Sequence, residues 1–336
     1  MGSNKLSKHE IIDGKEWQLP LSSEQMNYRK SRIVLLVLVV VAGFGAGQML
    51  SGGVDLSKGA ELPTREIVGV VDAAGGLPLI SPIGIVSVFG DFARATTVGM
   101  SIPLNLDYNG FSVKFDGKPG ALFGSFDASL DQANVQVPVD LDVSDGMVEV
   151  EIELEEDSGK GGMSTTFEVP AALASPGIFE FPPATGQAIV TNFSLGNDDV
   201  IAGSWAQRPG SVPVAAQPAA VGGVITIWCT GLGPVDQQGS LETGNTPPAG
   251  ALVTDKKVRV LIGGVEATVL GSVLQGTSVG LYQINAFVPE IELSTSDPIT
   301  IAEIVIEVDC DDETTIASRE GMTIAVREAP APPPAG

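Results

Sequence analysis

The stretch Gly222–Val235, GGVITIWCTGLGPV, combines an apolar run of strand-forming residues with an abrupt stop. Side chains alternate along a strand, so Trp228 lies on one face and Ile227 and Cys229 on the other. Apolar groups on both faces predict that a neighbouring domain covers the outer face. The Gly-x-Gly-Pro exit then ends the strand, because glycine tolerates positive φ and proline lacks an N–H donor.

The rest of the chain indicates an all-β fold. Its 336 residues predict about two domains, and 41 glycines and 23 prolines predict many turns. Runs rich in Val, Ile and Thr recur between these turn signals. The strand candidates are 67–71, 84–89, 112–115, 133–137, 147–154, 165–169, 188–191, 224–228, 257–262, 282–288, 299–308 and 322–326.

Four segments of the first half recur in the same order in the second half, which indicates an internal repeat. They are IVSVFGDFA (85–93) with VITIWCTGL (224–232), VKFDGKPGAL (113–122) with VLIGGVEATV (260–269), QANVQVP (132–138) with QINAFVP (283–289), and VEVEIELEED (148–157) with EIVIEVDCDD (303–312). We therefore predict two tandem β-sandwich domains.

The chain divides into seven predicted parts. They are a basic N-terminal tail (1–32), an apolar segment (33–50), a linker (51–65), a first domain (66–171), a joining segment (172–188), a second domain (189–327) and a Pro-rich tail (328–336).

The apolar segment 33–50 follows the basic run Arg29-Lys30-Ser31-Arg32. A basic flank keeps the N-terminus in the cytoplasm and sends the following chain outward. We therefore predict an exported protein at the cell surface, in the envelope or secreted. Two outcomes stay open: segment 33–50 is cleaved as a signal peptide, or it remains as an N-terminal membrane-anchor helix.

Composition excludes several classes of function. The net charge of −23 disfavours nucleic-acid binding. The only histidine, His9, lies in the N-terminal tail, which argues against Ser-His-Asp catalysis and ordinary zinc sites in the exported part. Glu149, Glu151 and Glu153 alternate with apolar residues, as on the outer face of a half-buried strand. We predict that the protein is not an enzyme and needs no cofactor.

The segments GGVITIWCTGLGPV, VRVLIGGVEATVLGS and VGLYQINAFVP resemble a bacterial C-terminal repeat, the Solibacter-type uncharacterised domain, which is related to the IPT/TIG immunoglobulin-like (Ig-like) fold. VSVFGDF and QANVQVP in the first half resemble its degenerate partner. The resemblance covers roughly residues 67–327, and it implies Ig-like sandwiches in an extracellular setting. That family has no assigned catalytic motif.

An Ig-like topology would put Cys229 at the end of strand B and Cys310 after strand F, in opposite sheets. In an oxidising compartment the two cysteines can form a disulfide across the core. Two free thiols are the main alternative, and metal ligation is a lesser one.

Two further sites are candidates. Trp205 could stack on a sugar ligand, or it packs between the repeats. Asp309, Asp311 and Asp312 form an acidic turn, which is either solvated or a weak Ca²⁺ site. We expect an adhesion, spacer or protein-interaction module with an extracellular protein or glycan as partner. The alternative is a carbohydrate-binding accessory protein.

Overall fold

The computed structural model describes residues 11–12, 15–16, 67–90, 101–108, 110–126, 131–155, 162–193, 202–211 and 215–329. His9, the apolar segment 33–50 and most of the Pro-rich tail lie outside the described residues. In the part of the chain that is described, no helix is long and apolar enough to cross a membrane. A short pair, β1 (Ile11–Ile12) and β2 (Lys15–Glu16), precedes the main body.

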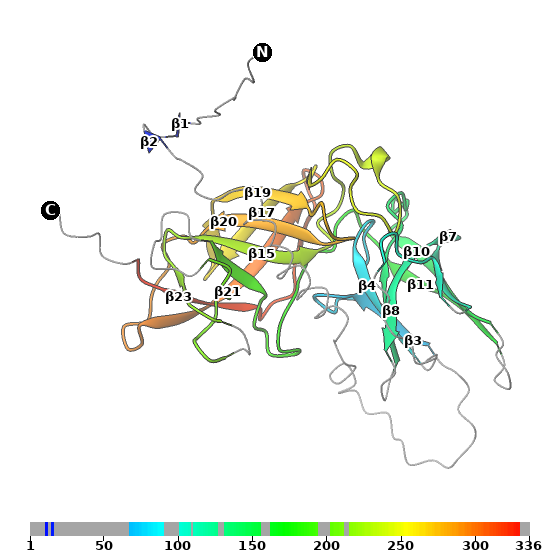
Figure 1. The fold of residues 1–336 in the computed structure, drawn as a ribbon, viewed down its shortest axis with the longest axis horizontal. Helices are drawn as coiled ribbons and strands as arrows, with labels where there is room; N and C mark the ends of the chain where they lie inside the picture. Colours follow the sequence, from blue (N-terminus) through cyan, green and yellow to red (C-terminus); the bar gives the residue numbers. More distant parts are fainter. Residues whose placement is uncertain are drawn as a thin grey trace, which may run out of the picture.

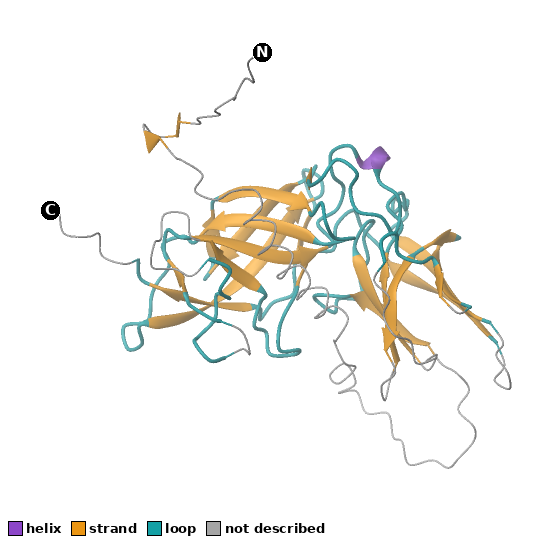
Figure 2. Cartoon of the chain, in the orientation of Figure 1, coloured by secondary structure: helices purple, strands orange, loops and turns teal. Residues whose placement is uncertain are grey.

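The first half forms a sandwich of two sheets, called unit 1 (Figures 1 and 2). Val88 and Val135 of the first sheet and Val113 and Ile152 of the second are fully buried in one apolar cluster between them. The first sheet contains, in order, β3 (Ile67–Asp72), β4 (Ile85–Gly90), β9 (Asp131–Gln136) and β8 (Ala121–Phe126). The second contains β11 (Met163–Pro170), β10 (Met147–Leu154), β6 (Phe111–Phe115) and β5 (Asp107–Tyr108), with β7 (Lys118–Pro119) also paired to β6.

The second half forms a second sandwich, unit 2, beside the first (Figure 1). One sheet contains β12 (Gly177–Ile178), β15 (Val224–Thr230), β20 (Tyr282–Phe287), β19 (Val269–Leu274) and β16 (Leu252–Val253), with β13 (Val190–Phe193) paired to β15. The other contains β14 (Ala219–Ala220), β23 (Thr323–Arg327), β21 (Ile299–Asp309), β17 (Lys257–Ile262) and β18 (Val265–Ala267), with β22 (Thr315–Ala317) paired to β21. A single 3-10 turn, η1 (Gln238–Ser240), lies in a connecting loop.

The two units share one strand order. The first sheets run β3-β4-β9-β8 and β13-β15-β20-β19, and the second sheets run β11-β10-β6 and β23-β21-β17. This is the ABED and GFC arrangement of an Ig-like sandwich. The fourth strand of the first sheet carries a register shift at the same place in both units, between Leu122 and Gly124 in β8 and between Val269 and Gly271 in β19. The repeat seen in the sequence is therefore a repeat of topology.

The opening stretch occupies the centre of this arrangement. Every residue of β15 is buried. Ile227 and Cys229 belong to the core of unit 2, whereas Trp228 belongs to a separate apolar cluster shared with unit 1. At Trp228, side chains of unit 1 thus share the cluster on the outer face of this strand, as the apolar residues on both faces predicted.

Two details differ from the sequence prediction. The fourth repeat match is shifted by one residue: Val113 pairs with Ile152 and its counterpart Val260 pairs with Ile306, whereas the sequence match equates Ile152 with Glu307. A slip of one residue exchanges the two faces of a strand, so the structural register is the one that keeps apolar side chains inside. In addition, β12 lies within the predicted joining segment 172–188 but pairs with β15 of unit 2.

Candidate functional site

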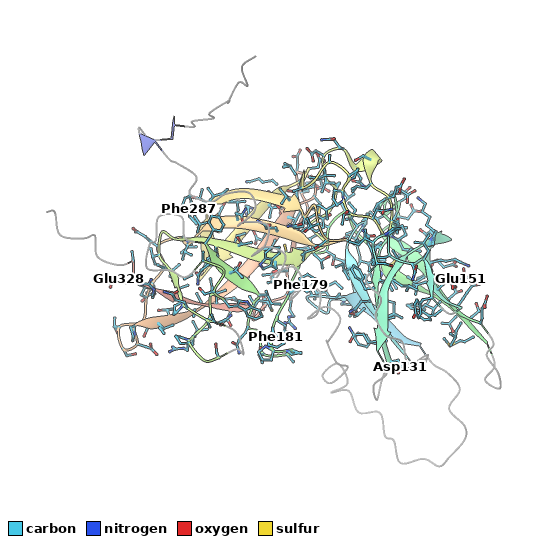
Figure 3. All side chains as sticks on the ribbon, viewed as in Figure 1. Asp131, Glu151, Phe179, Phe181, Phe287 and Glu328 are labelled. Carbon is cyan, nitrogen blue, oxygen red and sulfur yellow. The ribbon has the colours of Figure 1, made fainter. Side chains whose placement is uncertain are left out.

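The two units meet through a buried apolar cluster. Ile85 and Phe123 come from unit 1, and Trp228 and Leu281 come from unit 2. Phe179, which directly follows β12, is also in this cluster and lies between the two units in Figure 3. All five side chains are at most 4% exposed. A junction of this kind excludes water and opposes hinge motion between the units.

Hydrogen bonds fix the register of this junction. The main-chain N–H of Ile85 donates to Thr230 Oγ1 at 3.0 Å, and that hydroxyl donates to the Gly280 carbonyl oxygen at 2.9 Å. The N–H of Leu104 donates to the Gly244 carbonyl oxygen at 2.8 Å, and the N–H of Gly244 donates to Gln136 Oε1 at 2.7 Å. Donors and acceptors from both units thus satisfy each other where water is excluded.

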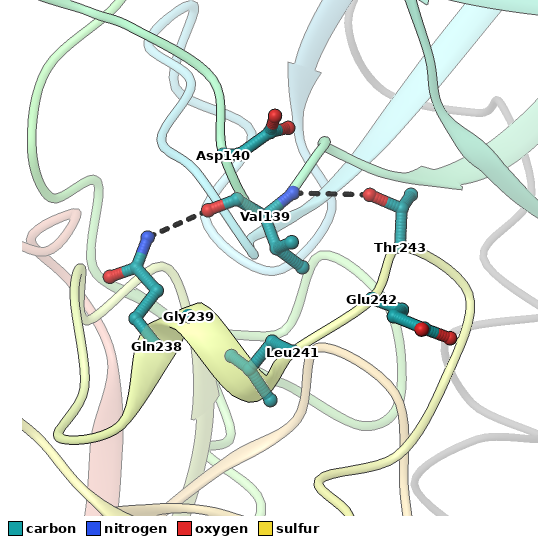
Figure 4. Close-up of a pocket in the computed structure, with 7 residues that line it drawn as sticks. All are labelled: Val139, Asp140, Gln238, Gly239, Leu241, Glu242 and Thr243. Atoms are coloured by element: carbon teal, nitrogen blue, oxygen red, sulfur yellow. Dashed lines mark hydrogen bonds between the residues drawn. The ribbon is translucent and has the colours of Figure 1, made fainter.

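A cavity of about 370 Å³ opens at the rim of the junction (Figure 4). Its two walls are held together because Gln238 Nε2 donates to the Val139 carbonyl oxygen at 2.7 Å and the Val139 N–H donates to Thr243 Oγ1 at 3.2 Å. The lining residues are Val139, Asp140, Gln238, Gly239, Leu241, Glu242 and Thr243.

The charged groups of this cavity are already partnered. Asp140 Oδ2 lies 2.9 Å from Lys118 Nζ, and Glu242 Oε2 accepts a hydrogen bond from Asn245 Nδ2 at 3.1 Å. The seven lining residues hold no serine, cysteine, histidine or lysine that could act as a nucleophile or base with them. The cavity is therefore part of the contact between units and does not resemble an active site.

The junction also contains a buried carboxylate, Asp72, at the end of β3. It is 3% exposed, and its oxygens accept hydrogen bonds from the N–H groups of Ala74, Gly75 and Leu77. Burial raises the pKa of Asp72 from 3.8 to about 6, although these hydrogen bonds and the charge of Arg319 act in the opposite direction. The sequence analysis missed this residue. The only signal for it is the turn-like run DAAGG that it begins.

Trp205 is not available to a ligand, which contradicts its proposed role in sugar binding. It is 2% exposed and belongs to the junction cluster. Its ring meets that of Phe181 edge to face, with centroids 5.7 Å apart. The alternative, packing between the repeats, stays a prediction: the cluster contains side chains of both units, but the ring and main-chain partners of Trp205 belong to unit 2. The carbohydrate-binding hypothesis thereby loses its best aromatic candidate for a sugar contact.

The expected disulfide is also absent, because Cys229 and Cys310 are both free and buried. Their strands do lie in opposite sheets of unit 2. Each sulfur, however, contacts its own sheet: Cys229 Sγ lies 3.7 Å from the Tyr282 carbonyl oxygen, and Cys310 Sγ lies 3.9 Å from that of Val308. Burial raises the pKa of both thiols, so little reactive thiolate forms near neutral pH.

Two free thiols predict a defined labelling pattern. In the native protein, iodoacetamide labels Cys229 and Cys310 slowly, because both are buried and protonated. In guanidinium chloride, without any reductant, mass spectrometry of the intact chain shows two added groups. A parallel sample that was reduced first shows the same mass. If iodoacetamide labels the denatured chain only after prior reduction, the disulfide exists.

The acidic turn does not gather its carboxylates around a common point. Asp309 Oδ1 accepts a hydrogen bond from Arg259 Nη2 at 2.9 Å, and Asp311 Oδ1 accepts the N–H groups of Glu313 and Thr314. Hydrogen bonds of this kind lower the pKa of both carboxyl groups, chiefly from the Thr315 hydroxyl for Asp309. Asp312 is exposed. Among the described residues, no group of three or more His, Cys, Asp or Glu side chains is placed to hold a metal ion.

The strand carboxylates lie on the outer face of unit 1, as the alternation predicted; Glu151 is labelled there in Figure 3. Lys114 Nζ lies 2.7 Å from Glu153 Oε2 and 3.2 Å from Glu151 Oε2. The hydrogen bond from Lys114 lowers the pKa of Glu153. A carboxyl group that acts as a catalytic acid needs a raised pKa, so this arrangement favours a structural role.

Comparisons with known proteins add little to this description. No family model and no curated protein matches the chain, so the resemblance to the Solibacter-type domain gains no support from them. A solved structure titled "Tandem Ig repeats of Dlar" is similar at 8% sequence identity and a TM-score of 0.20, over 79% of this chain and 98% of that chain. A score this low carries no argument, and the Ig-like assignment rests on the strand order.

Proposed function

We propose that this chain is a non-catalytic module of the cell exterior that holds two Ig-like units in a fixed arrangement for adhesion, spacing or protein interaction. The observation that carries the proposal is the junction. Two complete sandwiches share a buried apolar cluster and several hydrogen bonds across it. Such a junction fixes the position of one unit relative to the other, as a spacer or a presenting module requires.

One sequence feature supports an exterior location. Segment 33–50 is apolar and follows a basic run, the pattern of export signals and N-terminal anchors. The net charge of −23 keeps a protein soluble and discourages self-association. The partner is then an extracellular protein, and the membrane is a second contact if segment 33–50 is retained.

Epitope accessibility on intact cells that express the chain tests this location. A tag placed after Gly336 is expected to bind antibody on unbroken cells or to appear in the medium. A matched tag before Met1 is expected to bind only after lysis, because the basic flank keeps the N-terminus inside. A C-terminal tag that stays inaccessible until lysis would contradict the proposed exterior role.

A further inference from the structure

The outer edge of β11 differs from the other sheet edges that the structure describes. It has eight residues, and all eight pair with β10 without a register shift. The edge strands β3 and β8 have six residues each and contain a register shift, and the remaining described edge strands are two to four residues long. Short length and bulges are two of the usual protections of an exposed edge, and β11 has neither, although its sequence includes Glu168 and ends at Pro170.

The backbone register shows which groups point outward from β11. The Ala171 N–H donates to the Gly146 carbonyl oxygen on the β10 side, so the odd-numbered residues of β11 bond to β10. The even-numbered residues therefore direct their N–H and C=O groups to the outer edge. In the described part of the chain, a hydrogen bond reaches that edge only at Pro170, whose carbonyl oxygen accepts the Ile80 N–H at 3.0 Å.

The equivalent strand of unit 2, β23, is covered along its outer edge. Thr323 bonds to Gly186 and Ala188, and the Ala325 N–H donates to the Ala206 carbonyl oxygen. β14 then pairs with the last two residues of β23. The outer edges of β11 and β23 are thus equivalent positions in the two units. The edge is covered in unit 2, and in the described part of unit 1 it is open at Ser164, Thr166 and Glu168.

The side chains next to this edge define what it can bind. On the outer face of the sheet, Glu168 of β11 stands directly opposite Glu149 of β10, and like charges in that position repel. Lys114, a cation on the same face, is engaged with Glu151 and Glu153 instead. On the inner face, Met163 and Phe167 are only partly buried. An added strand would therefore gain from basic side chains on the outer face and apolar ones on the inner face.

We propose that the open edge of β11 is a strand-addition site for an extended segment of a partner protein whose side chains alternate between basic and apolar. Main-chain hydrogen bonds to Ser164, Thr166 and Glu168 supply affinity, and alternate side chains supply specificity. A second copy of this chain is a poorer occupant, because it brings another Glu168 and a charge of −23. The proposal names a surface for the interaction role proposed above and rests on that role.

The test uses the full chain and a fluorescent peptide of alternating valine and lysine, Val-Lys repeated four times. We expect it to bind, and we expect a Val-Glu peptide of the same length to bind at least tenfold more weakly. Thr166→Pro removes an outward N–H and leaves the odd-numbered bonds to β10, so it weakens binding at least tenfold. The control Thr166→Val keeps the N–H and the binding. Thermal melts confirm that both variants fold.

Hydrogen exchange locates the bound strand. The amides of Ser164, Thr166 and Glu168 exchange rapidly in the free chain and at least tenfold more slowly with peptide, whereas those of Thr165 and Phe167 are protected throughout.

Several outcomes would overturn the proposal. They are protection of the even-numbered amides in the free monomer, binding that survives Thr166→Pro, no binding to the wild-type chain, and a dimer of the free chain that Thr166→Pro dissociates. Each of these leaves the epitope test unaffected, so this proposal can fail while the exterior role stands.

Discussion

Replacing Gly231 by alanine is expected to lower the free energy of unfolding by at least about 3 kcal/mol, because a left-handed backbone and a steric clash coincide there. Gly231 has a φ of +72°, and a Cβ at this position would press against the Ser175 carbonyl oxygen, 2.7 Å from its carbon. The Ser175 N–H also donates to the Gly231 carbonyl oxygen at 2.8 Å, so the two segments cannot separate without losing that bond.

Gly222 provides the matched control at the other end of β15. Its φ is +75°, but a Cβ there would meet nothing within 4 Å. Gly222→Ala therefore bears only the cost of the left-handed conformation, about 1 kcal/mol. Urea unfolding of the wild type and both variants measures the difference. Equal losses for Gly231→Ala and Gly222→Ala would show that the contact with Ser175 does not limit this turn.

The sequence predicted the strands that follow simple alternation. Met147–Leu154 and Lys257–Ile262 have the predicted bounds, and both show a regular exchange of exposed and buried residues. It missed β8 and β19, where glycine interrupts the alternation. Gly124 and Gly271 each lie at a register shift, so the apolar residues on either side change face. Periodicity cannot reveal a strand whose period is broken by its own bulge.

Only those features of the candidate site that depend on the residue pattern of a single strand could be predicted from the sequence. The two apolar faces of β15 were enough to predict a covering domain. The roles of Trp205 and Cys229 depend on which residues lie opposite them in the folded chain. A single sequence does not give the distances between such residues. Cys229 lies in β15 and Cys310 directly follows β21 of the opposite sheet, but this placement alone does not orient one sulfur toward the other. The open edge of β11 likewise depends on which segments cover the repeated strand in each unit.

Asp72 is expected to make the protein more stable at mildly acid pH. Its pKa is raised from 3.8 to about 6 by burial, so the folded state holds a proton that the unfolded state releases. The resulting stability is fully present below pH 3.8 and is lost as the pH rises through 6. A tenfold change in proton affinity is worth about 1.4 kcal/mol, so Asp72 contributes about 2 kcal/mol more at pH 4.5 than at pH 7.5.

The variant Asp72→Asn removes this dependence, because an amide does not titrate in that range. Urea unfolding at pH 4.5 and 7.5 should therefore show a difference between wild type and variant that changes by about 2 kcal/mol. Asp297→Asn is the control. The hydrogen bond from Arg208 lowers the pKa of Asp297 from its ordinary value of 3.8. The stability that ionised Asp297 contributes is therefore lost only as the pH falls below 3.8. This control keeps the wild-type dependence between pH 4.5 and 7.5.

Direct titration separates Asp72 from other groups. The carboxyl carbon of Asp72, followed by NMR, is expected to titrate with a midpoint near pH 6. Because the same oxygens accept three main-chain N–H groups, protonation has to weaken at least one of these bonds, and the amide signals of Ala74, Gly75 and Leu77 should shift with the same midpoint. A midpoint near 4, or a wild-type pH dependence that Asp72→Asn retains, would assign the acid stabilisation to another residue and leave Asp72 ionised at the junction.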